Sequence, residues 1–213
     1  MTDLFALIAV ERRSAADFLD ELSDEQCSTA SLCTGWQVRH VAAHLTMPLV
    51  LSTPKLIGGM LKNRGDFNRF ADQYAKKTAA ATPVAELAAT VRANAEHRFT
   101  PPGMGAHAPL TDIVVHTLDM RVPLGVPGSG PGAEAVNEVL GFLMTSKATK
   151  GFLPKDRLPG LSFESTDTGW SGGSGSVVRG PASALALAIT GRAAGLDSLE
   201  GDGVAELRKR LAD

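Results

Sequence analysis

The chain has 213 residues, 44% of them hydrophobic, which is enough for one large domain or two small ones. A formal net charge of −2 and an aromatic content of 5% argue against a nucleic-acid-binding surface and against an anionic membrane partner. The cysteines, Cys27 and Cys33, match no zinc-ribbon or redox spacing, so we expect reduced thiols. No signal peptide is visible at the N-terminus, and we expect a cytoplasmic protein.

Amphipathic patterns in the first half of the chain predict a series of helices. Residues 3–22 repeat leucine, isoleucine and alanine at helical spacing and form the first helix. Thr34–Gln37 is typical of a capping box, with Thr34 as the cap of a helix that runs to Leu45 and is kinked or ended by Pro48. Residues 58–65 are typical of a turn, and two further helices are expected, at residues 66–81 and from Pro83.

The second half of the chain changes character after Gly151. Before it, we expect one helix from Pro109 to about Pro123 and another within residues 131–147. After it, the patterns predict strands at 161–166 and 176–179, a turn at 169–175, and helices at 182–190 and 204–211. We therefore predict an α+β protein with a helical bundle at residues 1–150 and a small α+β domain at residues 151–213.

Histidine and aspartate residues at helical spacing suggest a metal site. Asp112 and His116 are four positions apart, so they share one face of a helix, and Asp119 falls close to the same line. If His44 faces them from another helix, two imidazoles and a carboxylate converge, a set that suits zinc, iron, nickel or manganese and leaves a position open. Asp119 would hold the second ring nitrogen of His116. His40 is a rival ligand, for which we favour a surface role.

The remaining candidates are weaker. Arg121 and Arg192 could bind an anion, although Arg192 follows the end of an expected helix and can simply complement its dipole there. The glycine-rich residues 169–175 lack the lysine and the strand-to-helix setting of a phosphate loop. The sequence contains no Gly-x-Ser-x-Gly elbow of the kind that presents a nucleophilic serine.

Several short segments resemble the mycothiol-dependent maleylpyruvate isomerase family, which is related to the DinB-like metal-binding bundles. Residues Cys33–Leu45 resemble the family's second-helix signature, and residues 112–125 look like its acidic-x-x-x-His-x-x-Asp helix. Three segments near the C-terminus look like the family's C-terminal domain: Asp167–Trp170, Gly180–Ala182 and Gly191–Arg192.

The resemblance implies a DinB-like four-helix bundle that binds a divalent metal, usually zinc, followed by the small α+β domain. His44, Asp112 and His116 take the metal-ligand positions, although the isomerase has glutamate where this chain has Asp112. Arg192 matches a catalytic arginine that the second domain of the isomerase brings to its pocket. The resemblance further implies a cytoplasmic enzyme that uses mycothiol as its cosubstrate.

These observations lead to one main functional hypothesis and two alternatives. The main one is a metal-dependent enzyme that adds or transfers mycothiol, or isomerises a cis double bond, on a small electrophilic and carboxylate-bearing substrate. The alternatives are a metal-dependent hydrolase that uses bound water and a non-enzymatic module of the same fold that binds a small ligand. In each case we expect small-molecule partners rather than nucleic acid or membrane, and a monomer or a homodimer.

Overall fold

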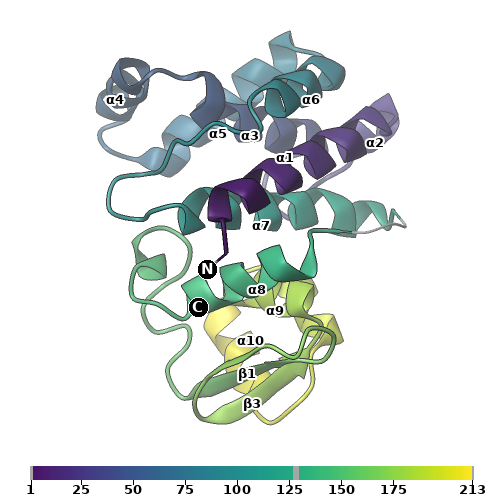
Figure 1. Ribbon diagram of the computed structural model, residues 1–213, viewed down its shortest axis with the longest axis vertical. Coiled ribbons are helices and arrows are strands. Elements are labelled where there is room, and N and C mark those ends of the chain that lie inside the picture. The colour runs from purple at the N-terminus through teal and green to yellow at the C-terminus, as the bar shows by residue number, and fades with distance from the viewer. Residues whose placement is uncertain (1, 127–129, 213) are drawn as a thin grey trace. The chain divides into compact units, whose positions relative to one another are not determined.

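The computed structural model describes residues 2–126 and 130–212, which divide into two compact units (Figure 1). The first unit comprises residues 1–99 and 119–127, and the second comprises residues 100–118 and 128–213. Helix α7 (His107–Leu124) contributes to both, because its residues from Asp119 onward group with the first unit. Among the described residues, no helix has the length and apolar character needed to cross a membrane.

The first unit is built from helices that pack along their apolar faces, as the sequence predicts. Helix α1 packs on α6, and α3 packs on both α5 and α6. The bounds of these helices are α1 (Leu4–Asp20), α2 (Asp24–Ser28), α3 (Val38–Val50), α4 (Thr53–Lys62), α5 (Phe67–Ala81) and α6 (Val84–Ala93). The expected helical bundle is confirmed.

A buried arginine ties two of these helices together. Arg12, on α1, is only 4% exposed, and its Nη1 donates to the backbone carbonyls of Ala95 at 3.0 Å and His97 at 2.7 Å. These carbonyls lie just beyond the last residue of α6, where a helix leaves acceptors without partners. The guanidinium therefore satisfies the end of α6 from inside the bundle.

The structure differs from the sequence predictions at the ends of two helices. Helix α3 begins after Gln37 rather than after Thr34, and the backbone N–H of Gln37 donates to His40 Nδ1 at 3.0 Å. Residues 58–62 continue α4 instead of forming a turn. Glycine at position 59 is required by packing, because a Cβ there would collide with the ring of Phe70 on α5.

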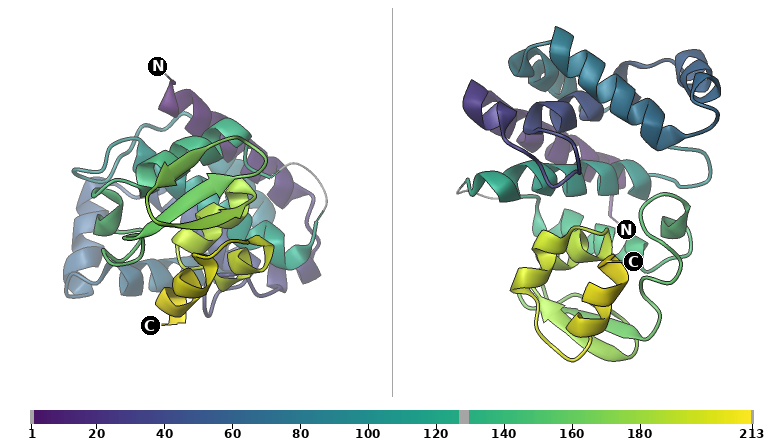
Figure 2. Two further views of the ribbon diagram at one scale, coloured as in Figure 1. Left: turned by 90° about the horizontal axis from the view of Figure 1, so that it is seen from below. Right: turned by 180° about the vertical axis from the view of Figure 1, so that it is seen from behind.

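The second unit joins a small sheet to a few helices. Strand β1 lies in the middle of the sheet, antiparallel to β2 and parallel to β3, and α9 packs on β1, β3 and α8 (Figure 2). The elements are α8 (Ala133–Leu143), the 3₁₀ helix η1 (Ala148–Lys150), β1 (Leu161–Ser165), β2 (Ser171–Gly173), β3 (Ser176–Gly180), α9 (Ala182–Ile189), the 3₁₀ helix η2 (Ala193–Ser198) and α10 (Val204–Ala212).

Glycines account for the main difference between the expected and the observed sheet. The glycine-rich residues 169–175 supply β2 as well as a turn, and β3 runs parallel to β1 instead of returning antiparallel to it. The chain crosses the start of β1 at Gly175, whose φ is +127° and where a Cβ would collide with the carbonyl of Gly160. The predicted α+β class is confirmed, and the expected domain boundary near residue 150 stays a prediction.

Candidate metal centre

Helix α7 presents a histidine and an aspartate one turn apart on the same side. His116 Nε2 lies 3.6 Å from Asp112 Oδ1, and these side chains are 14% and 30% exposed. Between them, Ile113, Val114 and Val115 are almost completely buried, so α7 is packed on several sides. A separation of 3.6 Å is too long for a good hydrogen bond, but both groups point towards one small region.

The next turn of α7 carries a buried aspartate that contacts the loop before α3. Asp119 is 0% exposed, and its Oδ2 accepts a hydrogen bond from Cys33 Sγ at 3.1 Å. Its backbone carbonyl accepts from the N–H of Leu32 at 3.0 Å. Side-chain and backbone contacts together therefore fix this loop to the C-terminal part of α7.

The same loop also contacts His44. The Trp36 ring centroid lies 5.2 Å from that of His44, which is 6% exposed on α3. Trp36 Nε1 donates to Asp72 Oδ1 at 2.9 Å, and hydrogen bonds from Lys76 and Trp36 lower the pKa of Asp72. The ring of Trp36 is thus held by an ionised acceptor on α5, and it limits where His44 can lie.

Two groups of side chains in the described part of the chain have an arrangement that could hold a metal ion. The first is His44, Asp112 and His116, whose ligand atoms lie within 4.8 Å of one another, and the second is Cys33, His116 and Asp119. Two imidazoles and a carboxylate are a normal set for zinc, and three protein ligands leave a position for a substrate atom. The donor set therefore fits a catalytic divalent metal.

Cys33 is the member of these groups that the sequence analysis did not select. Its spacing from Cys27 matches no metal motif, and nothing in the local pattern indicates that its thiol meets Asp119. The one available signal is its position at the first residue of the segment that resembles the family's second-helix signature. The contact itself depends on the packing of the loop against α7.

The other candidate residues have local partners. His40, in neither metal group, is half-buried and accepts from the Gln37 N–H, while burial and the nearby Arg39 lower its pKa. The guanidinium of Arg121 lies over the Phe18 ring, 4.6 Å from its centroid. Arg192 is half-buried, and its Nη1 donates to the carbonyl of Thr190 at 2.8 Å, directly after α9.

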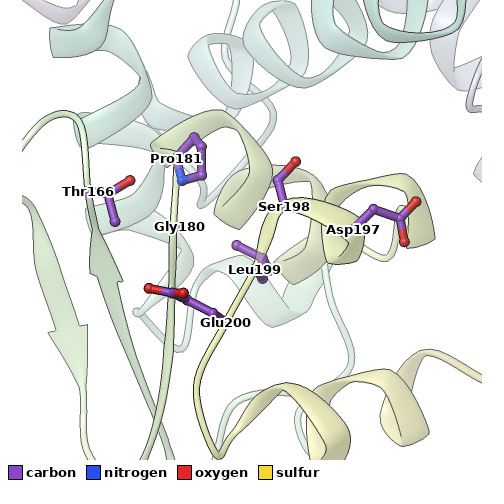
Figure 3. Close-up of a pocket in the computed structure, with 7 residues that line it drawn as sticks. All are labelled: Thr166, Gly180, Pro181, Asp197, Ser198, Leu199 and Glu200. Carbon is purple, nitrogen blue, oxygen red and sulfur yellow. The ribbon is translucent and has the colours of Figure 1, made fainter.

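Two surface cavities lie in the second unit, apart from these residues. One, of about 390 Å³, is lined by Thr166, Gly180, Pro181 and residues 197–200 (Figure 3). The other, of about 500 Å³, is lined by residues that include Leu143, Leu153, Lys155 and Leu161. Neither cavity is lined by a member of the metal groups, so the candidate site rests on its ligand geometry.

Comparisons with known proteins point to one family. The sequence model of the mycothiol maleylpyruvate isomerase N-terminal domain matches residues 8–121. Two solved structures, a mycothiol-dependent maleylpyruvate isomerase and a histidine-to-alanine mutant of it, share the fold with a TM-score of 0.57. Each is 14% identical to this chain, and the alignment covers 94% of this chain and 92% of the other. No curated protein sequence matches the chain.

Proposed function

Because the chain belongs to the mycothiol maleylpyruvate isomerase N-terminal domain family, we propose that it is a divalent-metal-dependent enzyme with mycothiol as its cosubstrate. Its reaction is the addition or transfer of this thiol, or a cis–trans isomerisation, on a small electrophilic substrate. The observation that supports this proposal most strongly is the convergence of His44, Asp112 and His116, whose ligand atoms lie within 4.8 Å of one another.

In this proposal, His44, Asp112 and His116 hold the metal, and zinc is the metal that we expect. A bound divalent metal lowers the pKa of a thiol that reaches it and so stabilises the thiolate. Asp119, held by Cys33, orients His116 by accepting from its second ring nitrogen. Asp112 is one methylene shorter than the family's glutamate, so its carboxylate reaches less far from α7.

The protein's other residues bind and orient the reactants. The buried ring of Trp36 next to His44 excludes water from one side of the site. Arg192 keeps donors available beyond its bond to Thr190, and a guanidinium pairs well with a substrate carboxylate. Addition of a thiolate to the substrate double bond, rotation about the resulting single bond and elimination of the same thiolate would account for isomerisation.

The decisive experiment combines metal analysis with a thiol-dependent assay. Purified protein should contain about one metal ion per chain and should convert maleylpyruvate only when mycothiol is present. His44→Ala and Arg192→Gln should both abolish turnover, but only His44→Ala should remove the metal. Wild-type protein that holds no metal would contradict the proposal.

The two alternative functions give different results in the same assay. Ester or amide hydrolysis by the metal-loaded protein without any thiol would identify a hydrolase and contradict the proposal. Binding of a small anion with neither metal nor thiol turnover would identify a non-enzymatic module. A thiol cosubstrate requires a reducing compartment, so the proposal also places the enzyme in the cytoplasm. A monomer or a homodimer remains our prediction for its oligomeric state.

A further inference from the structure

A buried arginine nitrogen without a partner lies in the loop before β1. Among the residues that the structure describes, Arg157 Nη1 is buried and has no hydrogen-bond partner. Leaving a buried donor unsatisfied is costly, and more so when the group is charged. Such a group in a folded protein calls for an explanation, and a bound anion is one that a guanidinium fits well.

The backbone that carries this side chain is fixed from the opposite direction. Nη1 of Arg210, on α10, donates to the carbonyl of Arg157 at 3.0 Å and to that of Pro159 at 2.8 Å. Arg210 also forms an ion pair with Glu206 at 2.8 Å. These contacts hold the loop in place, so the unsatisfied nitrogen belongs to an anchored segment.

The guanidinium of Arg157 lies against the chain directly after α9. A Cβ on Gly191 would come 3.5 Å from Arg157 Nη1, and Gly191 has a φ of +97°, which favours glycine. The next residue is Arg192, whose Nη1 is bound to the carbonyl of Thr190. Two half-buried arginines are therefore anchored around one short segment of the chain.

The charges near Arg157 do not neutralise it. Burial lowers the pKa of its guanidinium, and the neighbouring Asp156 opposes this shift only in part. No salt bridge to Arg157 occurs among the described residues, whereas the nearby Arg210 has its carboxylate partner. The region thus carries positive charge that a negatively charged ligand would offset.

We propose that Arg157 and Arg192 form a carboxylate-binding site after the end of α9, and that the substrate of this enzyme is therefore a dicarboxylate. Each planar guanidinium offers paired donors to one carboxylate, a geometry that a lysine ammonium does not reproduce. The identification of this ligand as the substrate rests on the proposed function, but the binding site itself does not.

Maleate tests the site because it is a small cis dicarboxylate. Calorimetric titration of the metal-loaded protein should show maleate binding that weakens about tenfold or more in Arg157→Gln, as expected when a charged hydrogen bond is lost. Arg157→Lys should recover only part of the affinity, because it restores the charge without the planar pair of donors. Arg208→Gln, which removes an exposed arginine from α10, is the matched control and should bind maleate like the wild type.

The outcomes separate this inference from the proposed function. Absence of maleate binding to the wild type, unchanged affinity in Arg157→Gln, or an equal loss in Arg208→Gln would overturn the carboxylate site. Mycothiol turnover of an uncharged electrophile tests the enzyme alone and should be unchanged in Arg157→Gln. Maleate binding that depends on Arg157 in a protein without any thiol turnover would support the site and contradict the proposed function. Should Arg157→Gln fail to fold, a wild-type affinity in Arg157→Lys would overturn the site.

Discussion

Two aspartates in this molecule show how the surroundings of a carboxylate decide its use. Asp167, after β1, accepts from Ser165 Oγ at 2.7 Å and from the backbone N–H of Ala182 at 2.9 Å, where α9 begins. Partial burial raises the pKa of Asp167, but these hydrogen bonds outweigh it and the net shift is downward. Asp112 faces an imidazole instead, 3.6 Å from His116. A carboxylate next to backbone donors stabilises a helix start, whereas one next to imidazoles suits a metal.

The strongest test of this contrast removes an imidazole from α7. We expect His116→Ala to contain almost no bound metal after purification, because the remaining histidine and carboxylate make too few bonds to retain a divalent ion. Elemental analysis of the purified variant measures the loss. His97→Ala, at an exposed position, is the control and should keep the wild-type metal content. Full metal retention in His116→Ala would place the ion elsewhere.

A second prediction tests whether the bundle depends on polar groups that do not bind metal. Arg12→Met should lower the free energy of unfolding by about 2–4 kcal/mol, because it leaves the buried carbonyls beyond α6 without their donor. Urea unfolding provides the measurement. Arg13→Met removes only an exposed ion pair with Glu96 and should cost less than about 1 kcal/mol. Equal effects of the two substitutions would show that the buried bonds contribute little.

The structural role assigned to Asp167 predicts a smaller effect. Asp167→Ala should destabilise the protein by about 1 kcal/mol, since the first N–H groups of α9 lose an acceptor. Thermal unfolding should show the change, while the metal content stays at its wild-type value. Metal loss in Asp167→Ala would mean that the two aspartates are not distinct in function.

The smallest effect that we predict concerns His40 and pH. Burial lowers the pKa of His40 in the folded protein below 6.5, so the unfolded chain takes up the proton first as the pH falls. The stabilising contribution is therefore complete above pH 6.5 and declines below it. His40→Gln keeps a neutral acceptor for the Gln37 N–H and should lose less stability than the wild type between pH 7.5 and 5. Parallel pH curves for the two proteins would contradict this role.

Local pattern was sufficient for the helical half of the candidate site. The spacing of Asp112 and His116 predicted their common face, because four residues complete about one helical turn and this relation needs no tertiary information. The choice of His44 as their partner needed the family resemblance, since no periodic pattern relates α3 to α7. The assignment of all three as metal ligands remains a prediction.

Features that depend on the packing of distant segments could not be predicted. The bond between Cys33 and Asp119 joins positions far apart in the sequence, and neither residue has a local pattern that identifies the other. Gly59 looked like part of a turn, but it makes room for the Phe70 ring inside a helix pair. The buried nitrogen of Arg157 is equally invisible to periodicity, because it follows from the way a loop lies against Gly191.

X-ray absorption at the zinc edge tests the central claim most directly, since it reports the atoms around the metal itself. The account predicts nitrogen and oxygen neighbours at about 2.0–2.1 Å with the outer scattering of two imidazoles, of which His44→Ala removes one. A first shell dominated by sulfur at about 2.3 Å, or one without imidazole, would contradict it.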